Sequence, residues 1–240
     1  MLEKLERFQL LLLGIVLAFG IYSATKFAST TIAKDGISVT GSAYQIVKSD
    51  SGKLTFEINT SSKTKVLAYK TLKSQLPIVE KYLQDKGIKD INLKSLNGYN
   101  TYKYNPVNGN YTNEVEKYNL TQPVEINCDD VNKIKEISLD ITGLIDKGID
   151  ININEISYNY SKMSELKVKL LKSTTEDAKD RASAMLSATN NKVGKIQSVK
   201  MGVFQITEPN STNVSDMGIN DTSTIDKKVT AVANVVFKIK

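Results

Sequence analysis

The 240-residue sequence contains no histidine and no tryptophan, and it has a single cysteine, Cys128. The missing histidine excludes Ser-His-Asp and Cys-His catalysis, imidazole acid-base chemistry and every zinc site with an imidazole ligand. The single cysteine excludes disulfides within the chain and metal sites built from several cysteines. We therefore expect no catalytic, cofactor-binding or metal-binding residues of the familiar kinds, and any chemistry is left to carboxylate, lysine or hydroxyl groups.

Arginine is nearly absent as well. Lysine and arginine together number 32, but only Arg7 and Arg181 are arginine; against 26 acidic residues they give a net charge of +6. Arginine supplies the planar fork that contacts phosphate groups and guanine through two hydrogen bonds. The lysines are also scattered among acidic residues, whereas nucleic-acid-binding proteins commonly concentrate them. We therefore expect no nucleic-acid partner.

An apolar run near the N-terminus predicts the compartment. Residues 8–25 carry no charge and follow Lys4 and Arg7, a pattern typical of a transmembrane helix or the core of a secretory signal. The nearest small-x-small cleavage site, Ala18-Phe19-Gly20, lies inside the run. We therefore favour residues 1–34 as an uncleaved signal-anchor and tether in the cell membrane, with domain 35–240 outside the cytoplasm. The alternative is a cleaved signal and a secreted or periplasmic protein.

The rest of the chain alternates the two-residue period of strands with the 3.6-residue period of helices. This order predicts an α+β fold of antiparallel or mixed sheets, with about seven strands and three helices on one side. Strands are expected near residues 37–43, 54–58, 90–99, 118–128, 151–160, 195–206 and 229–239. Helices are expected near residues 69–86, 131–147 and 162–190.

Several local features are predicted from individual residues. The polar residues 48–52 are expected to join the first two strands as a hairpin. Pro77 is expected to kink or divide the first helix, and Gly87 to end it. A phase slip at Asn154-Glu155 predicts a bulge in the fifth strand. The polar stretch 208–227 is long for a connection and is expected to be a mobile or functional arm.

Four short elements of the sequence carry a resemblance to a known family. They are Ile37–Ala43 with Lys48–Asp50, Gly87-Ile88 with Asp90-Ile91, Tyr104–Pro106 with Tyr118–Val124, and Glu176–Ala182 with Lys192–Ile196. In this order, behind an export segment, they resemble the SIMPL-domain family of bacterial envelope proteins. The resemblance implies a role in stress tolerance and large homo-oligomers in some members, with no established catalytic residue. Asn190 or Asn191 replaces the glycine that commonly ends the long helix.

The acidic pairs and the cysteine have structural interpretations. Asp129-Asp130 stands where a helix begins, and a carboxylate there caps the helix. Asp177, Asp180 and Arg181 have the spacing of pairs along one helix. Cys128 shares the inward phase of its strand with two apolar residues, which favours packing over a reactive thiol.

A tyrosine- and asparagine-rich stretch, residues 99–118, is the candidate binding segment. Tyr102, Tyr104 and Tyr111 alternate there with asparagines, and flat amphipathic rings beside amides suit glycan stacking or a protein interface. The alternative is a solvated hairpin loop whose tyrosines cover a neighbouring helix.

Two functions from different classes follow. The preferred hypothesis is a non-enzymatic, membrane-tethered envelope protein that forms homo-oligomers and contributes to envelope or oxidative stress tolerance. The alternative is a module that binds cell-wall glycan or another envelope protein through loop 99–118, with the 208–227 arm as a second contact. An enzyme restricted to carboxylate or lysine chemistry is the third and least favoured class.

Overall fold

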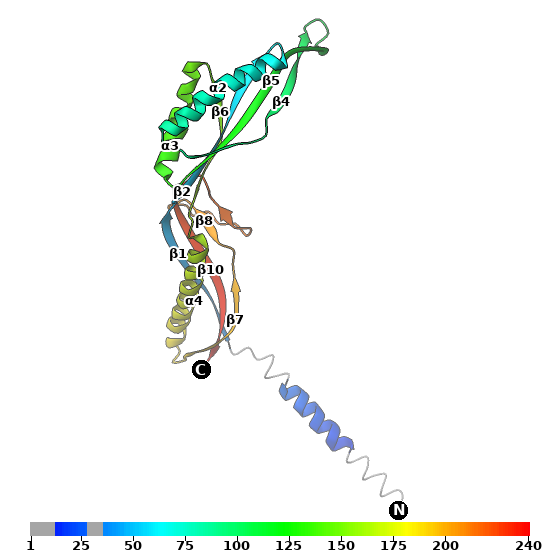
Figure 1. Cartoon of the computed structure of the whole chain (residues 1–240). Coiled ribbons are helices and arrows are strands. Elements are labelled where there is room, and N and C mark those ends of the chain that lie inside the picture. Colours follow the sequence, from blue (N-terminus) through cyan, green and yellow to red (C-terminus); the bar gives the residue numbers. More distant parts are fainter. Residues whose placement is uncertain (1–12, 28–35) are drawn as a thin grey trace, which may run out of the picture. The chain divides into compact units, whose positions relative to one another are not determined.

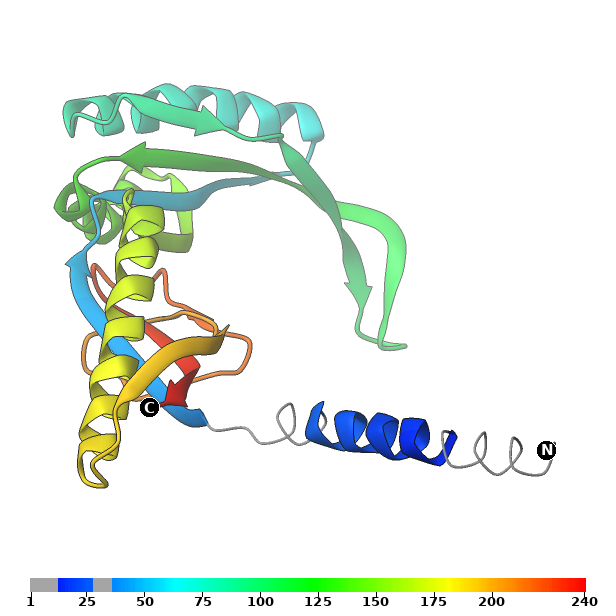
Figure 2. The same ribbon diagram turned by 90° about the horizontal axis from the view of Figure 1, so that it is seen from below.

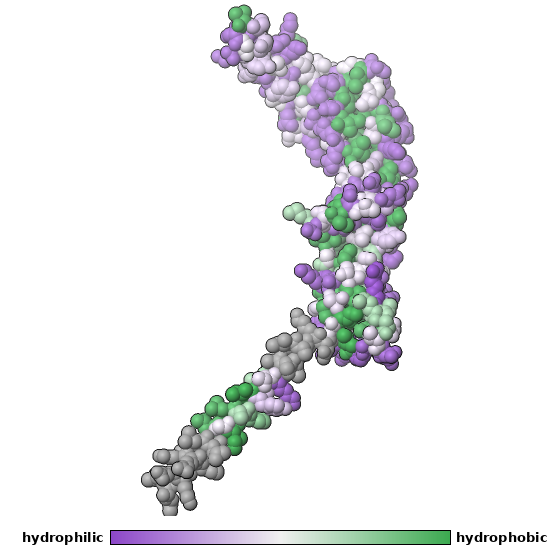
Figure 3. All heavy atoms as spheres, turned by 180° about the vertical axis from the view of Figure 1, so that it is seen from behind, coloured by the Kyte–Doolittle hydropathy of each residue, from purple (hydrophilic) through white to green (hydrophobic). Residues whose placement is uncertain are grey.

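The computed structural model describes residues 13–27 and 36–240, and residues 13–27 are helical. Residues 8–12 of the predicted apolar run and residues 28–34 of the predicted tether lie outside the described residues. Figure 3 shows apolar side chains along the described part of this segment. They include Leu13, Ile15, Val16, Leu17, Phe19 and Ile21. Within residues 13–27 and 36–240, no helix combines the length and the apolar character that crossing a membrane requires.

The fold is α+β, as predicted, with four α-helical segments and ten strands among the described residues (Figure 1). After residues 13–27 the elements are β1 (Gly36–Lys48), β2 (Ser51–Ser62), α2 (Lys65–Asp85), β3 (Asp90–Leu93), β4 (Asn97–Asn105), β5 (Asn110–Cys128), α3 (Val131–Asp140), the 3-10 helix η1 (Ile141–Lys147), β6 (Asp150–Asn159), α4 (Met163–Ser187), β7 (Val193–Met201), β8 (Gln205–Thr207), β9 (Ile219–Asn220) and β10 (Asp226–Ile239).

The chain divides into two compact units. The smaller contains residues up to Ser42 together with Thr174–Met201 and Ala233–Lys240, and the larger contains Ala43–Ser173 and Gly202–Val232. Because the boundaries fall inside β1, α4 and β10, these three elements contribute residues to both units.

The first sheet lies in the larger unit and is antiparallel, in the order β3-β5-β2-β6, with β4 also paired to β5. Alternate residues of β2, Leu54, Phe56 and Ile58, are fully buried against α2 and α3. The intervening residues of β2 are partly exposed, so they project to the opposite face of the sheet. The helices therefore cover one face of this sheet and leave a polar face.

The second sheet is mixed, because β8 pairs with β9 in parallel while β10 pairs antiparallel with β7 and β8. In the smaller unit, Ala178 and Ala182 of α4 pack against Val235 and Phe237 of β10. In the larger unit, Leu166 and Leu170 of the same helix form a second small core, together with Val47, Ile206, Val229 and Ala231. Small side chains in the second half of α4 thus seat the helix closely on the sheet, as its sequence indicated.

The predicted hairpin between the first two strands is wrong. β1 pairs with β10 in one sheet, and β2 pairs with β5 and β6 in the other. The connection is instead held by other loops. The backbone amide of Ser49 donates to the carbonyl oxygen of Ile225, and the side chain of Asp50 accepts hydrogen bonds from the amide and hydroxyl of Ser161. These partners direct the chain from one sheet into the other.

Other expectations need correction in detail. The strand expected at residues 90–99 is divided into β3 and β4, and the strand expected at 195–206 is divided into β7 and β8. Most of the expected loop 99–118 is strand, since β4 ends at Asn105 and β5 begins at Asn110. Pro77 does not divide the first helix, because α2 continues through it to Asp85.

Several local predictions are confirmed. Gly87 and Gly148 have φ angles of 79° and 76° where helical segments end, and Asn190 has a φ of 61° after the long helix. In β6, the partner residues pass from Glu155 to Ile153 between Thr55 and Phe56 of β2. The skipped residue is Asn154, so the bulge lies where the phase slip predicted it.

Candidate functional site

The three tyrosines singled out as contact residues lie on the β4–β5 hairpin, which extends away from α2 in both ribbon views (Figures 1 and 2). Tyr104 is opposite Tyr111, and their rings form an edge-to-face pair with centroids 5.6 Å apart. Their exposed fractions are 57% and 73%. Tyr102 is 42% exposed and lies opposite Val115. The hairpin therefore brings Tyr104 and Tyr111 together in solvent, and no helix among residues 13–27 and 36–240 covers their rings.

The hairpin end is held by local polar contacts. The side-chain oxygen of Asn105 accepts a hydrogen bond from the amide of Val107, and that of Asn108 accepts one from the amide of Asn110. Lys103 and Glu114 form an ion pair of 2.6 Å across the two strands. This exposed pair contributes little stability, and it lies where the strand register shifts, between the Tyr102–Val115 and Tyr104–Tyr111 pairs.

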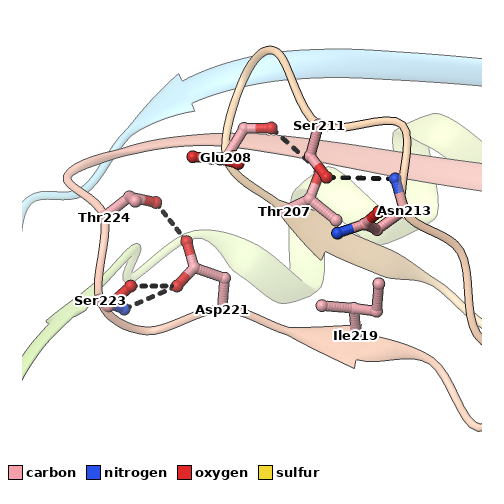
Figure 4. A pocket seen from close by; sticks show the side chains of 8 residues that line it. All are labelled: Thr207, Glu208, Ser211, Asn213, Ile219, Asp221, Ser223 and Thr224. Atoms are coloured by element: carbon pink, nitrogen blue, oxygen red, sulfur yellow. Dashed lines mark hydrogen bonds between the residues drawn. The ribbon is translucent and has the colours of Figure 1, made fainter.

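A pocket of about 280 Å³ lies in the polar stretch between β8 and β10 (Figure 4). At its edge the carboxylate of Asp221 accepts hydrogen bonds from the amide and hydroxyl of Ser223 and from the hydroxyl of Thr224. Burial acts to raise the pKa of Asp221, but these hydrogen bonds outweigh burial and lower the pKa below its ordinary value. Asp221 is thus engaged in holding its own loop.

Lys227 holds the same loop through hydrogen bonds to its backbone. Its side chain is buried, with 2% exposed, and its Nζ donates to the carbonyl oxygens of Asp221 at 2.7 Å and Thr224 at 2.8 Å. Burial lowers the pKa of Lys227, and the nearby carboxylate of Asp221 opposes that shift. Residues 221–227, the last part of the stretch expected to be a mobile or functional arm, are therefore held by internal hydrogen bonds. The burial of Lys227 could have been predicted from the sequence, because the alternation of β10 places Lys227 on the same face as buried Val229.

Two of the remaining acidic candidates, Asp130 and Asp177, hold parts of the fold. Asp130 is the N-cap of α3, and its side chain accepts from the amides of Asn132 and Lys133. Asp177 accepts from the amide of Ser42 at 2.8 Å and from Nε of Arg181 at 2.7 Å. These hydrogen bonds, the one from Ser42 foremost, lower the pKa of Asp177 against an opposing effect of burial.

The single cysteine packs against the core. Cys128 is partly buried beside the larger apolar cluster, and its sulfur accepts a hydrogen bond from the amide of Asp130 at 3.4 Å. In the part of the chain that the structure describes, no group of three or more acidic or cysteine side chains is placed to hold a metal ion.

The relation to known proteins follows from the sequence as a whole. The model of the SIMPL family, described as a protein of unknown function (DUF541), matches residues 37–237. The chain belongs to the SIMPL family. The SIMPL match runs from β1 into β10, so it includes residues of both compact units. No curated protein matches the sequence.

Proposed function

We propose that this SIMPL protein is a non-enzymatic envelope protein that is tethered to the membrane, lies outside the cytoplasm and self-associates. The observation that supports self-association is the edge of β7. This strand pairs with β10 on one side. Three of its apolar side chains are substantially exposed: Ile196 at 48%, Val199 at 45% and Met201 at 36%.

These side chains belong to the face of the sheet that forms the small core. Val199 lies opposite Val235 and Ile196 opposite Phe237 in the antiparallel register, so each pair shares a face. Val235 and Phe237 are buried under α4, whereas their β7 partners are not. An edge strand with exposed apolar side chains is a template for pairing with a further strand. A second copy of the chain is the partner that we propose.

Light scattering after size-exclusion chromatography of residues 35–240 tests this proposal. We expect an oligomer at micromolar concentration, and we expect Val199→Lys to dissociate it because a charge enters the apolar edge. Ser198→Lys is the matched control, since Ser198 is the adjacent residue and projects to the opposite face of β7. A strict monomer in the unmodified protein contradicts self-association, and equal effects of both lysines contradict the proposed surface.

The membrane tether rests on the apolar run at residues 8–25. Of that run, residues 13–25 are described as helical, with exposed apolar side chains. We expect the full chain to sediment with membranes and to retain its N-terminus, which fractionation and mass determination of the native protein measure. A mature N-terminus at residue 21 or beyond would instead support a cleaved signal and a secreted or periplasmic protein.

The absence of enzymatic activity is supported by how the perturbed ionisable groups are used. The carboxylates of Asp50, Asp177 and Asp221 all accept hydrogen bonds within the fold. Burial lowers the pKa of Lys227, and its side chain is enclosed and donates hydrogen bonds to two backbone carbonyl oxygens.

A contribution to envelope or oxidative stress tolerance is also proposed, and survival of a deletion strain under peroxide and detergent tests it. Survival equal to that of the parent strain contradicts this contribution.

A second candidate function is glycan or partner-protein binding through the β4–β5 hairpin. It is favoured by the exposed edge-to-face pair of Tyr104 and Tyr111. Replacing Tyr102, Tyr104 and Tyr111 by Ala is expected to abolish retention on purified cell-wall material. Because these rings are exposed, the unfolding midpoint is expected to change little. Unaltered retention removes the hairpin as the contact surface.

A further inference from the structure

The polar face of the first sheet contains a groove that sequence reasoning did not single out. α2 and α3 cover the opposite face. The groove contains a cavity of about 390 Å³, whose lining residues come from four neighbouring strands, β4, β5, β2 and β6. Three spacings of about 4.8 Å between strands give it a length of roughly 14 Å. Its lining includes Tyr99, Asn119, Thr121, Asn59, Glu57 and Asp150.

The strand register explains why these residues meet. Asn59 of β2 lies opposite Thr121 of β5 on one side and opposite Asp150 of β6 on the other. Tyr99 of β4 lies opposite Asn119 of β5. Because directly opposed residues share a face, all five side chains project from the polar face.

Hydrogen bonds within the groove fix the orientation of its amides. The hydroxyl of Thr121 donates to Oδ1 of Asn59 at 2.8 Å, and Nδ2 of Asn119 donates to the hydroxyl of Thr101 at 2.8 Å. Within the described part of the chain, each amide keeps one group without a hydrogen-bond partner. These groups are the Nδ2 donor of Asn59 and the Oδ1 acceptor of Asn119. Groups held in place before binding lose less conformational freedom on binding.

The other lining groups add acceptors and one flat apolar surface. The carboxylates of Glu57 and Asp150 have no ion-pair partner among the residues that the structure describes, and an ionised carboxylate only accepts hydrogen bonds. The ring of Tyr99 is 66% exposed at the β4 end of the groove. The groove therefore offers one fixed acceptor, one fixed donor, two carboxylates that are unpaired within the described residues and an aromatic face within one short distance.

We propose that this groove binds a polyhydroxylated glycan chain. Each sugar hydroxyl both donates and accepts, which matches the mixed lining, and the C–H face of a sugar ring packs on a tyrosine ring. The carboxylates repel phosphate groups, and the lining offers no cluster of apolar side chains to anchor a protein. A basic peptide could satisfy the carboxylates through its ammonium groups and the Asn59 donor through its backbone carbonyl groups, so titration with a basic peptide is part of the test. The glycan is favoured because it offers hydroxyl groups that both donate and accept along the whole groove, together with a C–H face for the ring of Tyr99.

This inference does not depend on self-association. It rests on the glycan-binding alternative for the class of ligand, but it moves the contact surface from the hairpin end to the sheet face. Tyr99, which belongs to the same tyrosine-rich stretch as Tyr104 and Tyr111, is the residue that distinguishes the two surfaces, because it lines the groove.

Isothermal titration of the full chain tests the proposal, in a detergent without a sugar headgroup, with chitohexaose and cellohexaose as probes. We expect at least one probe to bind. Tyr99→Ala is expected to weaken that binding by about tenfold, the effect of losing roughly 1.4 kcal/mol of ring contact. Tyr99→Phe keeps the ring and is expected to retain the affinity. Tyr111→Ala is the matched control, since it removes a ring that is also exposed, at 73%, outside the groove.

Two further measurements separate the alternatives. Titration with hexalysine, on the unmodified protein and on Asp150→Asn, tests for a basic peptide. The glycan assignment is overturned if the unmodified protein binds hexalysine but neither saccharide, and if Asp150→Asn abolishes the binding of hexalysine. Failure of both saccharides to bind at millimolar concentration overturns it as well, and loss of affinity in Tyr111→Ala but not in Tyr99→Ala overturns the location. Light scattering of the same samples reports self-association independently, so the two proposals fail separately.

Discussion

Replacing Gly41 of β1 by Ala is expected to destabilise the smaller unit strongly, because the backbone of α4 approaches β1 closely there. A Cβ atom at Gly41 would overlap the backbone carbonyl oxygen of Thr174 and would lie 2.7 Å from the backbone nitrogen and the Cβ of Ala178. Two of these three atoms belong to the helix backbone, so no side-chain rotation relieves the overlap. The helix would have to move away from Ala178 and Ala182, which are fully buried.

The expected cost is at the upper end of the range for overpacked cores, about 3 kcal/mol. For a chain of this size, that loss lowers the melting temperature by roughly 6–12 °C. Urea unfolding followed by circular dichroism measures it. The hydrogen bond from the amide of Ser42 to Asp177 also ties this strand to the helix, which restricts any shift that would relieve the overlap.

Two controls make the Gly41 prediction specific. Gly143→Ala adds the same methyl group where no atom lies within 4 Å, so its effect is expected to stay within about 0.5 kcal/mol. Adding Ala178→Gly to Gly41→Ala is not expected to restore stability, because the overlaps with backbone atoms remain and glycine costs about 1 kcal/mol in a helix. A Gly41→Ala protein within 0.5 kcal/mol of the unmodified one would refute the close approach.

Three smaller predictions follow from individual contacts. Asp130→Ala is expected to cost about 1 kcal/mol in urea unfolding through loss of the α3 N-cap, whereas an equal loss in Asp129→Ala would contradict the assignment of the cap to Asp130. Hydrogen bonds from Ser161 lower the pKa of Asp50, so their stabilisation is complete above the ordinary pKa of 3.8 and is lost as the pH falls through the lowered value. The stability deficit of Asp50→Asn relative to the unmodified protein is therefore expected at pH 7 and should shrink in strong acid; a deficit independent of pH would refute this. Burial lowers the pKa of Lys227, so the cost of burying its charge is present at neutral pH and disappears above the ordinary pKa of 10.5. The unmodified protein should thus gain stability relative to Lys227→Met between pH 7 and pH 10.5, and a constant difference would contradict the charged, desolvated amine.

The helices and their ends could be predicted from the sequence because their signals are local. Asp130 caps α3 through amides two and three residues away, and Gly87 and Asn190 follow helices in the left-handed conformation. Each of these features depends on a few consecutive residues. The bulge at Asn154 was equally local, since the phase of the apolar residues changes within β6 itself.

The pairing of β1 and the β4–β5 hairpin could not be predicted in the same way. The partner of β1 is β10, at the other end of the chain, and a strand's own period does not identify its partner. Every residue of β4 is exposed or only partly buried. A strand without a buried face has no reason to alternate apolar and polar residues, so the period that reveals strands was missing from residues 99–118.

The groove could not be predicted from the sequence for a related reason. Asn59, Tyr99, Thr121 and Asp150 each belong to a different strand, and each alone has the character of an ordinary solvent-facing residue. Only the register makes them neighbours, because a shift of one residue in any strand turns its side chains to the other face.

The bulge at Asn154 connects this register to the hydrophobic core. On one side of it Ile151 and Ile153 lie opposite Ile58 and Phe56, and on the other Ile156 lies opposite Leu54. Without the extra residue, these two apolar sets would project to opposite faces. Burying both sets therefore fixes the phase of the first residues of β6, and that phase places the carboxylate of Asp150 on the polar face beside Asn59. The packing of the core thus determines which polar groups meet in the groove.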